Sequence, residues 1–70
     1  MMPLIFADME KDYIIKKIGG SSEVRAHLEN LGFVVGGSVK VISSIAGNLI
    51  VNVKESRVAI SKEMAGKIMV

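Results

Sequence analysis

From Ser38 onward the chain alternates apolar and polar residues with a period of two, which is the pattern of half-buried β-strands. In the first of these stretches Val39, Val41 and Ile45 are predicted to face inward, and Ile42 is predicted to face the other way. Two turn signals, "AGN" at 46–48 and "KES" at 54–56, interrupt the alternation. The pattern predicts three short strands, with a hairpin between the first two.

Three further segments complete the predicted β and turn elements. "YIIKKI" (13–18) is rich in β-forming residues and predicts a strand, and "KIMV" (67–70) predicts a last one. "SKEMAG" (61–66) predicts one helical turn capped by Ser61, and a short turn after Pro3 is expected to place Leu4 and Ile5 on the core. The predicted inward residues of the later strands, 49–53, 57–60 and 67–70, are Leu49, Val51, Val53, Val58, Ile60, Ile68 and Val70.

Residues 21–31, "SSEVRAHLENL", have the signals of an amphipathic helix. Ser21 or Ser22 can cap its first N–H groups, and a glutamate in the first turn suits the positive end of the helix dipole. Val24, Leu28 and Leu31 stand at i, i+4 and i+7 and share one face, while Arg25 and Glu29 can pair on the solvent side. Gly32 follows where a left-handed residue commonly ends a helix.

The chain has 70 residues and no cysteine, so a small core must stabilise it without disulfides. Five short strands in a flat antiparallel sheet would leave exposed edges, and rolling them into a barrel removes most of that problem. The sequence therefore predicts a single mainly β domain over 1–70. We expect a small, partly open five-stranded barrel with one α-helix and one or two short helical turns.

Phe33-Val34-Val35 lies between Gly32 and Gly36 and puts a wholly apolar run on a turn. One interpretation is that Phe33 fills the barrel mouth, because small domains use their aromatic residues for burial. The other is that Val34 or Val35 stays exposed and forms an apolar docking patch. Both can hold, with Phe33 inward and Val34 outward.

The charged residues do not indicate nucleic-acid binding. The net charge is +2 with the two signs interleaved, and the aromatic residues are only Phe6, Tyr13 and Phe33. A duplex binder would usually show a basic stripe, and a single-strand binder would add stacking aromatics. Lys16 and Lys17 are adjacent on a predicted strand, so they are expected to point to opposite faces. No segment resembles a secretory signal or a membrane helix, which predicts a cytoplasmic protein.

The sequence also offers little chemistry. His27 and Glu23 are four residues apart on the helix, but a metal site needs several ligands and two exposed side chains are usually only solvated. No arrangement of residues suggests a nucleophile. Met9, Met64 and Met69 are expected to fill gaps in the core. We therefore predict a protein without catalytic residues, cofactor or metal site.

The spacing of the helix and the turn resembles the FeoA family, which is associated with ferrous-iron transport. That family has a Gly-rich turn followed by the pattern R-x-x-L-x-x-M/L-G-L/F-x-x-G-x-x-V-x-V. The matching residues here are Gly20, Arg25, Leu28, Leu31, Gly32, Phe33, Gly36, Val39 and Val41. The closing segment "RVAISKEMAGKIMV" is also similar, through Ala59, Ala65 and Ile68. The family's Pro-Gly pairs are replaced by Val35-Gly36 and Glu10-Lys11.

The resemblance implies an SH3-like barrel that acts as a cytosolic, non-enzymatic adaptor. Its implied partner is the cytoplasmic part of a FeoB-type ferrous-iron permease, which would hold the chain at the membrane only indirectly. We expect the contact on Arg25, His27, Glu29 and the Phe33–Val35 turn. The alternatives are an SH3-like module that binds nucleic acid or belongs to a metal-dependent repressor, and weak self-association through an open barrel edge.

Overall fold

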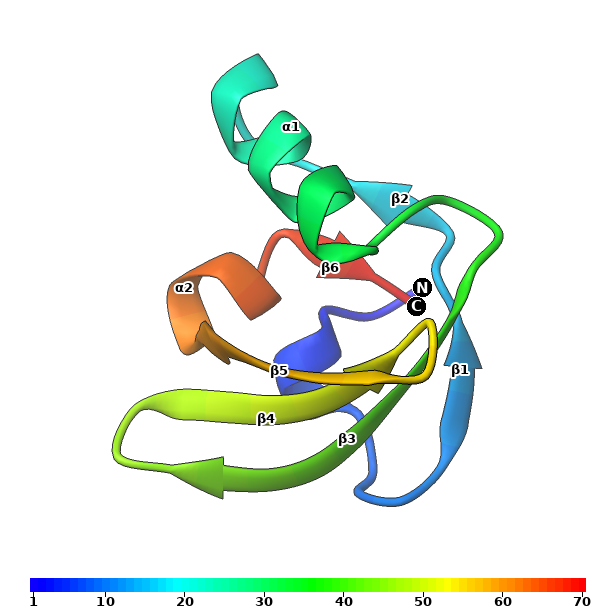
Figure 1. The fold of residues 1–70 in the computed structure, drawn as a ribbon, viewed down its shortest axis with the longest axis vertical. Helices are drawn as coiled ribbons and strands as arrows, with labels where there is room; N and C mark the ends of the chain where they lie inside the picture. Colours follow the sequence, from blue (N-terminus) through cyan, green and yellow to red (C-terminus); the bar gives the residue numbers. More distant parts are fainter.

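The computed structural model describes residues 1–70 as a small, mainly β fold with one full helix, and it confirms the predicted fold class (Figure 1). A four-stranded antiparallel sheet has the strand order β1-β3-β4-β5, and a two-stranded sheet pairs β2 with β6. The elements in chain order are η1 (Leu4–Phe6), β1 (Asp12–Ile14), β2 (Lys17–Ile18), α1 (Ser22–Leu31), β3 (Ser38–Ile45), β4 (Asn48–Val53), β5 (Ser56–Ser61), α2 (Lys62–Ala65) and β6 (Ile68–Met69).

The two hairpins of the large sheet follow from their turn residues. Ala46 and Gly47 both have positive φ, as do Lys54 and Glu55 in the second turn. A two-residue turn with positive φ at both positions matches the right-handed twist of the flanking strands. It sets the registers that begin at Ile45↔Asn48 and at Val53↔Ser56. The predicted turns are therefore confirmed, and β4 and β5 begin one residue earlier than expected.

The predicted strand 13–18 is broken in two, which gives six strands instead of five. Ile15 lies at the break, where it is fully buried and donates its N–H to the Gly37 carbonyl at 2.8 Å. The next residue, Lys16, donates to the Met69 carbonyl at 2.7 Å. The chain thus leaves the four-stranded sheet beside β3 and enters the two-stranded sheet beside β6. This crossing joins the two sheets around one core.

A bulge in β3 corrects the predicted alternation. Val41 pairs with Val51, but the next pair is Ser43 with Ile50, so one extra residue lies between them. A bulge moves every later side chain to the opposite face. Ser44 therefore lies opposite the buried Leu49, and Ile45 is 60% exposed instead of facing inward.

Helix α1 forms as its sequence predicts. The Val24 N–H donates to the Ser21 side-chain oxygen at 3.2 Å, and Gly32 ends the helix with φ of 108°. Leu28 is fully buried, and Val24 and Leu31 pack against the core beside it. The predicted Arg25–Glu29 pair does not form, since the structure contains one ion pair, Lys40–Asp12 at 3.8 Å.

The core consists of buried apolar residues from every element except β1, with no buried polar side chain. Leu4 is fully buried as predicted, but Ile5 is partly exposed. Met9 is exposed instead of filling a gap, because residues 7–11 run along the outer edge of β3, where Met9 forms a parallel bridge with Val41. The buried residues are Leu4, Ile15, Ile18, Leu28, Phe33, Val39, Val41, Leu49, Val51, Val53, Ile60, Ala65, Ile68 and Val70.

Candidate functional site

The Phe33–Val35 turn divides its apolar residues between the core and the surface. After Gly32, the Phe33 N–H donates to the Leu28 carbonyl at 2.9 Å, and the Phe33 ring is fully buried. The chain then leaves the core, so that Val34 is half-buried and Val35 is 64% exposed. Gly36, with φ of 89°, donates to the Ile15 carbonyl at 2.8 Å and ties the turn to the break between β1 and β2. The outward residue is Val35 and not Val34.

This turn forms one wall of a surface groove of about 510 Å³, which we call the basic groove. Helix α1 contributes the opposite wall, and the segment at the start of β2 contributes the floor and rim. The lining residues are Lys16, Lys17, Ile18, Arg25, Glu29, Val34 and Val35. Arg25 and Glu29 reach it together because residues four apart share one side of a helix.

The basic groove combines positive charge with apolar surface. Three cationic side chains and one carboxylate line it, and none of them forms an ion pair within the chain. Lys16 and Lys17 both border it, so the prediction that they face opposite sides is wrong. The reason is the break at Ile15, where the regular alternation of a strand is interrupted between β1 and β2. Such a groove suits an acidic segment that also offers an apolar side chain.

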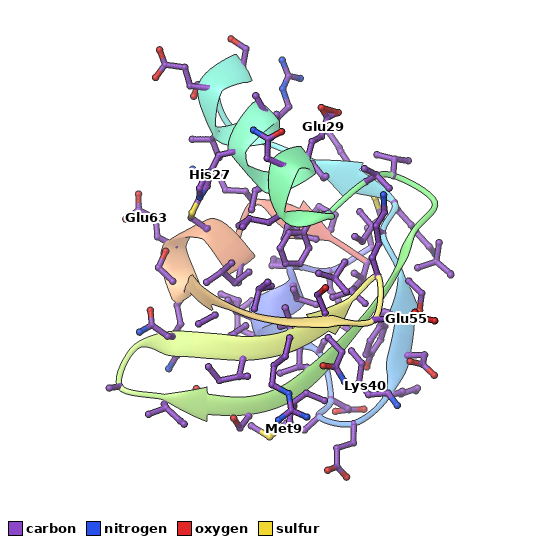
Figure 2. The ribbon with its side chains drawn as sticks, viewed as in Figure 1. Met9, His27, Glu29, Lys40, Glu55 and Glu63 are labelled. Atoms are coloured by element: carbon purple, nitrogen blue, oxygen red, sulfur yellow. The ribbon has the colours of Figure 1, made fainter.

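The structure gathers four of the six residues predicted to bind a partner. Arg25, Glu29, Val34 and Val35 line the basic groove, whereas Phe33 lies beneath it in the core. In Figure 2 His27 is seen on the α2 side of α1, whereas Glu29 is seen on the side toward β2. Lys16, Lys17 and Ile18 are the lining residues that the sequence did not predict. The sequence feature that could have indicated the two lysines is that they stand next to each other just before Ile18.

The residues of the family motif have structural positions that fit their types. Gly20, Gly32 and Gly36 all have positive φ, a conformation that glycine adopts without strain. Leu28 and Val39 are buried in the core, and Leu31 packs against it. His27 and Glu23 are exposed, and no group of three or more His, Cys, Asp or Glu side chains comes together. No helix has the length and apolar character needed to cross a bilayer.

A family model described as the FeoA domain matches residues 2–70, which is nearly the whole chain. This chain belongs to the FeoA family. A protein of Methanocaldococcus jannaschii, provisionally named Fe(2+) transport protein A, is 37% identical over 70 residues, which cover all of this chain and 85% of that protein. The resemblance inferred from the spacing of Arg25, Gly32 and Gly36 is therefore confirmed, and it connects the chain with ferrous-iron transport.

Solved structures agree with this assignment. A crystal structure of an iron uptake regulatory protein, FeoA, superimposes with a TM-score of 0.90 at 32% identity, covering 99% of this chain and 92% of that one. The solution structure of FeoA from Chlorobium tepidum gives 0.88 at 21% identity, covering 97% and 67%. ScaR with bound Zn2+ gives 0.84 at 18% identity, covering 97% of this chain and 35% of ScaR. At that identity the likeness to ScaR shows a shared fold alone.

Proposed function

We propose that this FeoA-family chain is a non-enzymatic adaptor of ferrous-iron uptake that binds the cytoplasmic part of a FeoB-type permease. Membership of a transport-associated family supports the process. The basic groove supports a role in binding, because it is the place where exposed apolar surface and unpaired charge occur together beside α1. The observation on which the proposal rests is that Arg25, Val35 and two lysines converge on this groove.

The groove suggests how the partner is recognised. A net charge of +2 from three cations and one carboxylate attracts an acidic surface and raises the rate of encounter. Val35 can then bury its exposed methyl groups in the complex, while Val34 and Ile18 supply further apolar lining. Charge therefore orients the two proteins, and burial of Val35 slows their dissociation.

The action on the permease would be a shift between its conformations or assemblies. An adaptor can shift such an equilibrium only by binding one state more tightly than the other. No bond is made or broken in this mechanism. The basic groove must therefore distinguish two arrangements of the partner's cytoplasmic surface.

A titration of the ¹⁵N-labelled chain with the soluble cytosolic domain of the permease tests the proposal. We expect amide shifts at Lys16, Lys17, Arg25 and Val35, together with weaker binding at higher salt. Reversing two charges with Lys17→Glu and Arg25→Glu should weaken binding roughly 2- to 30-fold, given about 0.2–1 kcal/mol for each exposed charge pair.

Lys54→Glu is the matched control, because Lys54 lines a separate polar hollow with Asp12, Lys40 and Glu55 on the outer face of the sheet. That change should leave the affinity within twofold. If no amide shifts at high partner concentration, the adaptor proposal fails. If binding occurs but Lys54→Glu weakens it as much as the groove variants, the assignment of the groove fails.

A further inference from the structure

A second, apolar opening lies far from the basic groove, between η1 and the outer half of β3. We call it the apolar slot; it encloses about 390 Å³. Its floor is the core itself, through Leu4, Val41 and Leu49. Two side chains on its wall project into solvent, Phe6 at 68% and Met9 at 54% exposure. In Figure 2 Met9 lies beside β3, at the opposite end of the molecule from Glu29.

A free strand edge borders the apolar slot. On the edge of β3 that faces away from β4, strand β1 pairs only with Ser38–Lys40. The Met9 bridge extends the pairing of that edge to Val41 and no further. Residues 43–45 of β3 pair with β4 alone. Ile45↔Asn48 closes the two-residue hairpin, so the next pair, Ser44↔Leu49, is the non-hydrogen-bonded type. The backbone N–H and C=O of Ser44 consequently point away from β4, at the rim of the slot that its side chain lines.

We propose that the apolar slot and the β3 edge bind a second copy of this chain about a two-fold axis near Ser44. A two-fold interface uses the same surface on both partners, so that surface must be complementary to itself. This one offers both a slot and the projecting side chains of Phe6 and Met9 that can enter its counterpart. Two β3 edges related by the axis run antiparallel, which lets Ser44 of each copy pair with the other.

The charges around the slot fit the same arrangement. Lys62 is the single charged residue that lines it, and the segment along its border carries Asp8 and Glu10 on the two sides of Met9. When Met9 of one copy approaches the slot of the other, these carboxylates come with it toward Lys62. A partner surface of a single charge sign could pair with Lys62 or with the two carboxylates, but not with both. A second copy of this chain carries both the cation and the carboxylates.

The expected dimer is weak. A standard interface buries about 800 Å² on each partner, close to a fifth of the 4227 Å² surface of this chain. The apolar slot and the three-residue edge at 43–45 are smaller than that, which places the dimer among weak associations. Its dissociation constant should lie roughly between 10 μM and 1 mM.

Sedimentation equilibrium and amide spectra of the full chain from about 20 μM to about 1 mM test the proposal. We expect the mean mass to rise toward a dimer, with concentration-dependent shifts at Phe6, Met9, Ser44 and Ile45. Met9→Lys and Ile45→Lys change exposed side chains, so the fold should survive, and each should weaken self-association at least fivefold.

Val35→Lys is the control, since it makes the same change at an exposed valine on the distant groove and should leave the dimer unchanged. A chain that stays monomeric to about 1 mM overturns the proposal. It is equally overturned by a dimer that Met9→Lys and Ile45→Lys leave intact, or by shifts confined to other surfaces. The permease titration tests binding at the basic groove, which is a different surface. The presence or absence of a dimer therefore neither supports nor contradicts the adaptor proposal.

Discussion

The Phe33–Val35 turn and the η1 turn at Leu4–Phe6 place apolar residues on the surface in the same way. Each is a three-residue stretch whose first side chain is fully buried and whose third is about two-thirds exposed. In both, a backbone hydrogen bond fixes the turn, from Phe33 N–H to the Leu28 carbonyl and from Ala7 N–H to the Leu4 carbonyl. The buried residue anchors the segment, and the exposed one projects into solvent.

The surroundings of the two turns differ. Val35 lies among Lys16, Lys17 and Arg25, which are unpaired within the chain. Phe6 lies beside the free edge of β3, with Lys62 as the one charge of its pocket. Charges around an apolar residue favour a specific, oriented partner. An apolar residue at an open strand edge favours pairing with another strand. The same local arrangement therefore produces two surfaces of different character, one charged and apolar and one apolar beside a strand edge.

Removing the anchor of the first turn should have the largest effect. Phe33→Ala leaves a cavity in the centre of the core, and substitutions of this kind cost about 3–5 kcal/mol. Since small domains have little more stability than that, the variant should be largely unfolded at 37 °C. Urea denaturation followed by circular dichroism measures the change in free energy of unfolding. A cost below about 1 kcal/mol would show that Phe33 does not anchor the turn.

Leu4→Ala should cost about 2–5 kcal/mol, and less than Phe33→Ala because fewer buried carbons are lost. Leu4 anchors a segment near the chain start, which Pro3 and Met2 tie to β6 through the Pro3↔Met69 bridge and the Met2–Val70 hydrogen bonds. The measurement is the same denaturation, with hydrogen exchange of the Ala7 amide beside it. If the cost is small but Ala7 exchanges rapidly, the first turn opens independently of the core, and the two anchors are not equivalent.

The sequence predicted the elements that depend on local signals. Helix α1, its cap at Ser21, its end at Gly32 and the two hairpins follow from residue types at fixed spacings. The break at Ile15 and the bulge after Val41 depend on tertiary contacts, namely the bonds to Gly37 and the register of β4. Two adjacent apolar residues, Val41-Ile42, were the one trace of that bulge in the sequence.

The same distinction explains what was predicted of the candidate site. Arg25, Glu29, Val34 and Val35 could be placed together because they lie on one side of a helix and on the turn that follows it. Lys16 and Lys17 could not, because the break that turns both toward the groove is made by pairing with β6 and the Gly37 segment. Met9 likewise could not be recognised as exposed until its position outside β3 was known.

Gly32→Ala should have an intermediate effect on stability. It tests whether the end of helix α1 fixes the position of the Phe33–Val35 turn. Gly32 has φ of 108°, and an added Cβ would lie 3.5 Å from the Lys54 side chain, so space is available. The cost is therefore one of backbone strain, about 1–2 kcal/mol. Thermal denaturation measures it. A neutral result would mean that the helix can end differently and that the position of the Phe33–Val35 turn is not fixed by Gly32.

The smallest effects on stability are expected at the two exposed residues. Val35→Ser and Phe6→Ser remove side chains that are mostly in solvent, so each should change the free energy of unfolding by about 0.5 kcal/mol or less. The pair nevertheless separates the two surfaces, because Val35→Ser should weaken only the permease titration and Phe6→Ser only the self-association. Each variant serves as the control for the other, since both are apolar-to-serine changes at similar exposure. If both variants weaken the same association, the two turns belong to a single contact surface, and the difference in their charged surroundings does not determine what they bind.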